Sequence, residues 1–207
     1  MNGARIFLYK PLIIENLLPK SYQEDLIKIV HDMVGWQLSS VTSGGPQGMN
    51  TFTDNNTIDS IQFVNVPFIY GNENFLFPKI KPMLYCIEDK LNSRIKNLAR
   101  IKINHTAKIP NFTKDNYNIP HADDGNPNLL SLIYYINDSD GDTFFFDEEF
   151  SETHSVNKLT LVGRITPRMG RAVVFPARKF HAGSNPINNP SRFVINFVFE
   201  LENGNVF

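Results

Sequence analysis

The feature that most constrains the fold is a series of short strand-like runs after residue 98. Each run is rich in β-branched and aromatic residues, and each ends at a cluster of Gly, Pro, Asn or Asp that is typical of a turn. This pattern indicates an all-β sandwich or barrel. The predicted strands are Leu98–Ile103, Leu129–Ile136, Thr143–Phe146, Lys158–Ile165, Ala172–Phe175 and Phe193–Leu201.

The first part of the chain predicts a strand and a helix. Arg5–Ile14 is strand-like, although Pro11 places it at a sheet edge or breaks it. Ser21 and Glu24 form a capping-box pattern for a first helix that ends at Gly35. The apolar face of this helix consists of Leu26, Ile27, Ile29, Val30 and Met33.

A long polar loop, Ser39–Asn56, separates this helix from a predicted strand at Ile61–Val66. Loops of this length are uncommon in compact domains unless they are functional or disordered, so we expect a lid or substrate loop. A second amphipathic helix follows, and Pro78 suits its first turn. Its apolar residues at helical spacing are Ile80, Met83, Leu84, Ile87 and Leu91.

Together these elements predict a mainly β (α+β) fold, a double-stranded β-helix or jelly-roll core braced by N-terminal helices. The 207 residues fit a single domain, with residues 1–97 as support and residues 98–207 as the core. A hydrophobic fraction of 42% and seventeen Phe residues suit a packed interior lined with rings.

Composition narrows the classes of function and location. A formal net charge of -1 gives no broad attraction for nucleic acid or an anionic membrane. The single cysteine, Cys86, excludes an internal disulfide, suits a reducing cytoplasm and is interpreted as a packing residue. No signal core and no uncharged apolar run of about 18 residues is present, so we expect a soluble protein.

His121 and Asp123 are the first candidate metal ligands. They follow Pro120 with one residue between them, which on an extended segment places both side chains on the same face. The two side chains could therefore bind one ligand together. However, Asp123 also begins an Asp-Asp-Gly run typical of a turn, and this interpretation is favoured when the pair is considered alone.

His181, sixty residues after His121, changes that balance. It follows a predicted strand that a barrel can bring beside His121 and Asp123. Two neutral imidazoles and one carboxylate form the facial triad that suits Fe(II) and leaves three coordination positions open. An oxygenase can use two of these for a keto acid and one for O₂. By itself, His181 is more often a surface or core histidine.

Arg192 opens a strongly alternating run eleven residues after His181. Alternation places Arg192, Val194 and Asn196 on one strand face, opposite a face of Phe and Ile residues. A guanidinium that points into a barrel needs an anionic partner, and a carboxylate can bind it bidentately. An exposed Arg at the start of a strand is the alternative.

The chain resembles the prolyl 4-hydroxylase-like branch of the Fe(II)- and 2-oxoglutarate-dependent dioxygenases over roughly its C-terminal half. The resemblance implies that iron is bound by His121, Asp123 and His181. It also implies that the cosubstrate is bound by Arg192, Tyr135 and Asn196. It rests on an ordered set of motifs: His121-Ala122-Asp123, Leu132–Asn137, Gly141–Phe144, Gly170–Phe175, His181 and Arg192.

The implied activity is hydroxylation of an aliphatic C–H bond, with peptidyl proline as a candidate substrate. The implied cofactors are Fe(II), 2-oxoglutarate as cosubstrate and O₂, and ascorbate is a further candidate. Two positions depart from the family pattern. One glycine, Gly141, stands where family members usually carry two, and Asn104 stands near the place of a tyrosine that often lies close to the cosubstrate.

Other functions stay open at this point. A jelly roll can also recognise a sugar or peptide without catalysis, since fold does not fix function. A free amino acid, another protein side chain or a small metabolite are alternative substrates, whereas the near-neutral charge disfavours a nucleic-acid demethylase. We expect a monomer or homodimer without membrane association, with substrate choice set by the loops 39–56 and 108–118. His31, His105 and His154 are interpreted as structural or solvated.

Overall fold

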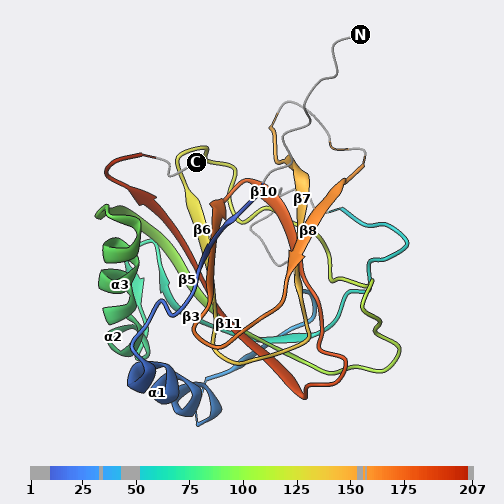
Figure 1. Ribbon diagram of the computed structural model, residues 1–207, viewed down its shortest axis with the longest axis horizontal. Helices are drawn as coiled ribbons and strands as arrows, with labels where there is room; N and C mark the ends of the chain where they lie inside the picture. Colours follow the sequence, from blue (N-terminus) through green and yellow to red (C-terminus); the bar gives the residue numbers. More distant parts are fainter. Residues whose placement is uncertain (1–9, 33–34, 43–51, 153–155, 157, 205–207) are drawn as a thin grey trace.

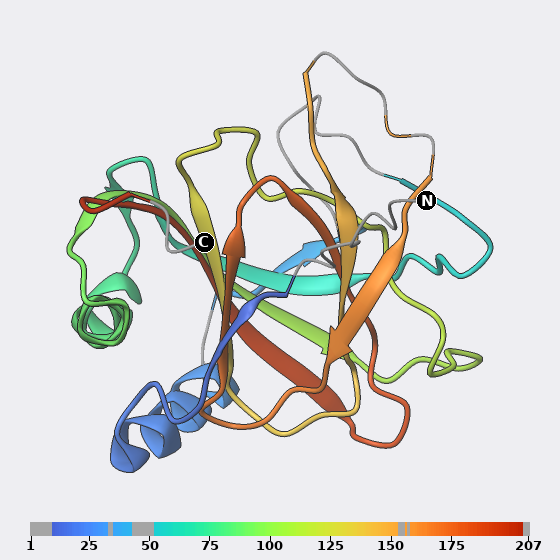
Figure 2. The ribbon, with the colours of Figure 1, turned by 45° about the horizontal axis from the view of Figure 1, so that its top comes forward.

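The computed structural model describes residues 10–32, 35–42, 52–152, 156 and 158–204. Within these residues the chain forms two antiparallel sheets and three helices, and the helices lie along one side of the larger sheet (Figure 1). The smaller sheet lies on the opposite side, as the rotated view in Figure 2 also shows.

The larger sheet contains eight strands in the order β1-β9-β6-β11-β5-β3-β2, with β4 paired to β3. These strands are β1 (Leu12–Ile14), β2 (Gln37–Ser39), β3 (Gln62–Ile69), β4 (Asn72–Glu73), β5 (Ile95–Ala107), β6 (Leu130–Tyr135), β9 (Ala172–Pro176) and β11 (Ser191–Leu201). The smaller sheet has three strands in the order β10-β7-β8: β7 (Thr143–Glu149), β8 (Leu161–Ile165) and β10 (Lys179–Gly183).

The two sheets enclose a shared interior, which makes the fold a jelly roll and confirms the predicted fold class. One buried cluster contains residues from strands of both sheets and therefore joins them face to face. Its members are Ile133, Tyr135, Phe145, Ile165, Val173, Phe175 and Val194.

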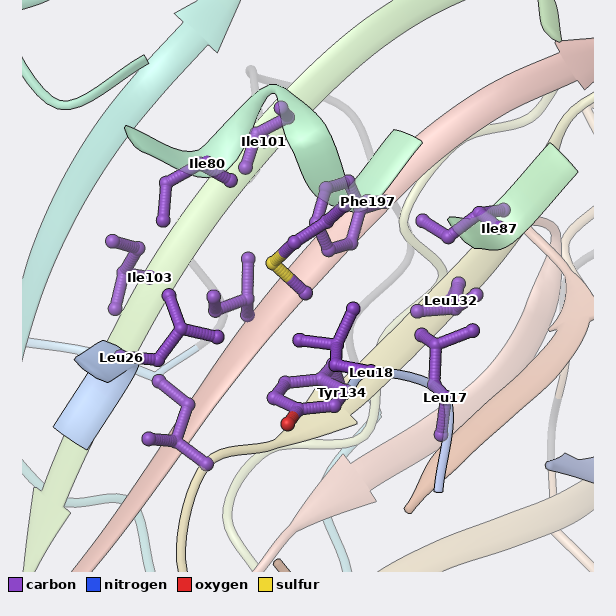
Figure 3. Close-up of a cluster of buried hydrophobic side chains, with 14 of the residues drawn as sticks. Leu17, Leu18, Leu26, Ile80, Ile87, Ile101, Ile103, Leu132, Tyr134 and Phe197 are labelled. Carbon is purple, nitrogen blue, oxygen red and sulfur yellow. The ribbon is translucent and has the colours of Figure 1, made fainter. Parts of the chain in front are cut away.

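The main hydrophobic core lies between the helices and the outer face of the larger sheet. The helices α1 (Lys20–His31), α2 (Phe77–Ile80) and α3 (Pro82–Leu91) pack buried apolar residues onto that face. Figure 3 shows Leu26, Ile80 and Ile87 from the helices close to side chains of β5, β6 and β11. This layer holds the larger sheet in place, so its inner face can carry polar residues.

The structure corrects both helix predictions. The first helix begins at Lys20 after Pro19, so Ser21 lies inside the helix, and no side chain caps its start by a hydrogen bond. The capping-box pattern of Ser21 and Glu24 therefore predicted the wrong N-terminus for this helix. The second predicted helix is two helices, because Pro82 cannot continue the hydrogen bonding of α2 and instead begins α3. Cys86 packs partly buried against the helix-facing core, as expected.

The predicted strands are present with shifted ends, but β10 was missed. The chain from Lys179 to Gly183 carries His181 and pairs with β7. β1 is the edge strand that Pro11 favoured, although residues 5–9 of that prediction lie outside the described residues. The centre of the loop 39–56 also lies outside them, and its first residue ends β2. The described segments contain no helix long and apolar enough to span a membrane.

Substituting Leu26 tests the packing of α1 onto the sheet. Leu26 is fully buried in the core, so Leu26→Ala should lower the free energy of unfolding by about 2–5 kcal/mol, measured by urea denaturation. Leu38→Ala removes the same atoms at a site that is 64% exposed and should change it by less than about 0.5 kcal/mol. Equal losses in the two variants would contradict this account of the core.

Candidate metal centre

His121, Asp123 and His181 converge on one point, and their potential ligand atoms all lie within 4.8 Å of one another. The convergence is fixed by the backbone. The amide of His121 donates to the carbonyl of His181 at 2.9 Å, and the amide of His181 donates back at 3.0 Å. The amide of Asp123 donates to the carbonyl of Ala177, just before β10, at 2.9 Å. The segment that carries the first two residues is therefore bound alongside β10.

Both imidazoles are held with the same nitrogen turned away from the centre. Nδ1 of His121 lies 3.0 Å from the carbonyl oxygen of Ile119, and Nδ1 of His181 lies 3.1 Å from that of Lys179. A carbonyl can only accept, so each Nδ1 carries the hydrogen and each Nε2 keeps a free lone pair. Nε2 of His181 is 3.6 Å from Oδ2 of Asp123.

The carboxylate of Asp123 is held by three side chains from three adjacent strands of the larger sheet. Nη2 of Arg100 on β5 donates to Oδ1 at 2.6 Å. Oγ of Ser131 on β6 donates to Oδ2 at 2.6 Å, and Nδ2 of Asn196 on β11 donates to Oδ2 at 2.9 Å. Asn196, which the resemblance assigned to the cosubstrate, thus contacts the carboxylate of the candidate ligand.

Electrostatics favour the protonation states that a metal requires. Burial lowers the pKa of His121 to about 4, with a further lowering from His181, while Asp123 acts in the opposite direction. Burial also lowers the pKa of His181. For Asp123, burial alone would raise the pKa, but His181 and Arg100 outweigh it and hold the pKa well below its usual range. At neutral pH the group therefore presents two neutral imidazoles and one carboxylate.

This donor set fits a divalent first-row metal. Imidazole nitrogen and carboxylate oxygen are the ligands of the two-histidine, one-carboxylate triad that suits Fe(II). Bonds of about 2.1 Å at right angles place neighbouring ligand atoms about 3 Å apart, so the 3.6 Å separation of Nε2 of His181 and Oδ2 of Asp123 needs only a small contraction. The backbone carbonyls on both Nδ1 atoms supply the orienting contacts that metal-binding histidines usually have.

Arg192 points into the barrel, and its predicted alternation is confirmed. Phe193, on the opposite face, belongs to the helix-facing core. The guanidinium is buried and donates through Nε to the carbonyl of Gly141 at 2.8 Å and through Nη2 to Oγ1 of Thr143 at 2.8 Å. A Cβ on Gly183 would lie 3.2 Å from Nη1, so this glycine lets the backbone approach the guanidinium. In the described chain no carboxylate lies within ion-pair distance of Arg192.

Tyr135 is connected to Arg192 through Thr143. Its hydroxyl donates to Oγ1 of Thr143 at 2.8 Å, the same oxygen that accepts from Arg192. Burial raises the pKa of Tyr135, so the hydroxyl keeps its proton and remains a donor. Arg192, Tyr135 and Thr143 therefore form one hydrogen-bonded group at the end of the barrel where β11 begins.

Arg100 and Ser131 were not predicted from the sequence, and Thr143 was named only as part of the motif Gly141–Phe144, without a role. Arg100 carried a signal that could have been recognised, because β5 alternates charged or polar residues with isoleucine, which predicts a polar face inside the barrel. The other histidines behave as expected where they are described. His105 stacks on Phe193 with ring centroids 4.2 Å apart and lies on the outer face, and His154 lies outside the described residues.

Comparison with known proteins agrees with this geometry. A family model described as the 2OG-Fe(II) oxygenase superfamily matches residues 107–200, the part of the chain that contains all three converging residues and Arg192. A comparison with curated proteins finds no match.

Several solved structures share the fold at low sequence identity. The epimerase SnoN from nogalamycin biosynthesis has a TM-score of 0.56 and 10% identity, covering 92% of this chain and 78% of that one. A Trichoplax adhaerens prolyl hydroxylase in complex with a peptide has a TM-score of 0.53 and 14% identity, covering 93% and 84%. A Pseudomonas putida prolyl-4-hydroxylase has a TM-score of 0.52 and 12% identity, covering 92% of each chain.

These likenesses establish the jelly-roll fold, and the family match adds the oxygenase domain in the second half of the chain. The description of this family model and the converging His121, Asp123 and His181 favour an oxygenase over a non-catalytic binding module. Residues 107–200 are therefore similar to the 2OG-Fe(II) oxygenase superfamily, on a fold that prolyl hydroxylases share.

Proposed function

We propose that this oxygenase hydroxylates an aliphatic C–H bond, with Fe(II) bound by His121, Asp123 and His181 and 2-oxoglutarate anchored by Arg192. One observation carries the proposal. A two-histidine, one-carboxylate group lies in the same barrel as a buried guanidinium that has no carboxylate partner within the described residues. The first can bind a metal, and the second needs an anion that the protein does not supply.

Each bound group has a separate task in this scheme. Fe(II) supplies activation of O₂, coupled to oxidative decarboxylation of the cosubstrate. In the overall reaction, a substrate C–H group, O₂ and 2-oxoglutarate yield a C–OH group, succinate and CO₂. His121, Asp123 and His181 hold the metal, and a triad of this kind leaves three coordination positions for other ligands.

Arg192 and Tyr135 hold the far carboxylate of 2-oxoglutarate. The guanidinium is fixed by Gly141 and Thr143 before the anion binds. The Tyr135 hydroxyl gives its one hydrogen to Thr143, so it donates to the anion by turning this hydrogen away from Thr143. Asn196 acts on Asp123 and orients the carboxylate ligand. Ser131 has the same role from the neighbouring strand.

Peptidyl proline is the first candidate for the oxidised group, and residues 98–207 are proposed as the catalytic core. The similarity to two prolyl hydroxylases supports proline, whereas the similarity to an epimerase of nogalamycin biosynthesis supports a small metabolite. A free amino acid stays a further alternative. Cytoplasmic location, a monomeric or homodimeric state, the absence of nucleic-acid substrates and the use of ascorbate remain predictions.

Replacing His121 tests the metal site. His121→Ala should reduce Fe(II)-dependent succinate formation from 2-oxoglutarate to background and weaken Fe(II) binding, because one of three ligands is removed. This variant is preferred to one at Asp123, whose loss would leave Arg100 buried without its partner. His31→Ala, on the exposed side of α1, is the control and should keep full turnover. Undiminished succinate formation in His121→Ala would refute the assignment.

Replacing Arg192 tests the cosubstrate anchor. Arg192→Ala should weaken 2-oxoglutarate binding by roughly 2–5 kcal/mol, which is about 30-fold or more in Kd, because a charge-assisted pair is lost. The measurement is a 2-oxoglutarate titration of the Fe(II) protein under anaerobic conditions. Arg94→Ala removes an exposed arginine outside the barrel and should leave Kd unchanged. A normal Kd in Arg192→Ala would exclude Arg192 from the site.

The protonation states predict how metal affinity depends on pH. Because the pKa of His121 is about 4, this imidazole stays neutral as pH falls from about 7.5 to about 6, and burial lowers the pKa of His181 in the same direction. Fe(II) affinity should therefore change little over this range. Two histidines with ordinary pKa values near 6.5 would instead lose roughly tenfold in affinity, because protons compete with the metal. A tenfold loss, measured by anaerobic Fe(II) titration, would contradict the lowered pKa values.

A further inference from the structure

The barrel-facing side of β5 carries four polar residues in a row, Arg100, Lys102, Asn104 and Thr106. The isoleucines between them belong to the helix-facing core, so the alternation is maintained along the strand. Across the pairing with β11, Thr106 lies opposite Arg192 and Lys102 lies opposite Asn196. This polar strip therefore runs from the proposed cosubstrate anchor to the candidate metal ligands.

Several buried polar atoms on the strip have no hydrogen-bond partner. They are Nε of Arg100, Oδ1 of Asn104 and Oγ1 of Thr106, and across the described chain Tyr134 has the one further side-chain atom of this kind. A buried polar atom without a hydrogen-bond partner lowers the stability of the fold. Their concentration on one strand face, inside the barrel, indicates that a bound molecule supplies the missing partners.

Lys102 is a second cation on this strip, and within the described residues no carboxylate lies within ion-pair distance of it. It is partly buried, and among the described residues its ammonium group makes no ion pair or hydrogen bond. The remaining segments, 1–9, 33–34, 43–51, 153–155, 157 and 205–207, contain no Asp or Glu. Burial and Arg100 lower the pKa of Lys102 to about 8, against the opposing effect of Asp123, so at neutral pH the amine is still mostly charged. A partly buried charge of this kind is costly unless a ligand offsets it.

The other charges of the site have partners in the proposed function. Arg100 pairs with Asp123 at 2.6 Å, and Arg192 binds the far carboxylate of 2-oxoglutarate. The keto-acid end of that molecule is offset by the divalent metal. Lys102 therefore has no ion-pair partner after metal and cosubstrate are in place. It lies close enough to the candidate ligands that its charge lowers the pKa of His121, while Asp123 raises the pKa of Lys102.

We infer that the oxidised substrate carries a carboxylate or phosphate group that binds Lys102 beside the metal centre. Nε of Arg100, two residues away on the same strand face, is a second donor for this anion. Oδ1 of Asn104 accepts a hydrogen bond from a hydroxyl or amide of the same molecule. The inference rests on the proposed function and deepens it by naming the substrate class, so Lys102 is a residue that determines specificity.

The test compares substrates that differ only in charge. The Fe(II) protein with 2-oxoglutarate is assayed for succinate formation with N-acetylproline, other N-acetyl amino acids and alkyl phosphates, and with their neutral partners, the carboxamides and parent alcohols. The anionic members should stimulate turnover above the basal rate and the neutral ones should not. In Lys102→Met the KM for the best anion should rise roughly 30-fold or more, with a smaller effect on kcat. Lys102→Arg, which keeps the charge, should restore most of the affinity.

A lysine on the same strand provides the control. Lys96→Met removes an exposed ammonium that pairs with Glu200, and it should behave as the unmodified protein. Equal responses to charged and neutral partners, including no response to either, would overturn the inference. A loss of 2-oxoglutarate affinity in Lys102→Met, without a change in the KM for the anion, would also overturn it by assigning Lys102 to the cosubstrate. Absence of basal 2-oxoglutarate turnover in the unmodified protein would instead refute the proposed function.

Discussion

The alternation of side chains along β5 and β11 is the constraint on which the whole site depends. One face of each strand is apolar and is covered by the helices, which fixes both strands in one register from Ser191 to Val198. The other face can then carry charged groups inside the barrel. A slip of one residue would move Lys102 and Arg192 into the helix-facing core and their aromatic neighbours into the site. The hydrophobic layer thus determines where the chemistry can occur.

The sequence predicted those parts of the site that depend on local periodicity. The alternation of the last strand predicts that Arg192 and Asn196 lie on one face, and the spacing of His121 and Asp123 predicts that their side chains point in the same direction. The jelly roll followed from short strands and turn clusters in the second half of the chain. Each of these signals lies within about ten residues of sequence, where propensity and pattern are informative.

Features that arise from long-range pairing were not predictable in the same way. Arg100 contacts Asp123 because the backbone of Asp123 is bound to Ala177, across the barrel interior from β5, and no local pattern specifies that partner. β10 was missed because its five residues are flanked by a proline-containing turn and carry no clear alternation, and its strand form depends on pairing with β7. The N-terminus of α1 was predicted wrongly because Ser21 and Glu24 match a known capping pattern, whereas Pro19 is not a typical N-cap residue.

The three side-chain hydrogen bonds to Asp123 affect how metal binding is coupled to folding. One donor comes from each of three neighbouring strands, so the carboxylate is immobilised by folding alone. An ion that arrives later meets a preorganised ligand, and little conformational entropy remains to be lost on coordination. Metal would then raise thermal stability through mass action, in proportion to its free concentration, without being needed to nucleate the fold. In this respect the chain is the opposite of small zinc modules, which are unfolded until their ion binds.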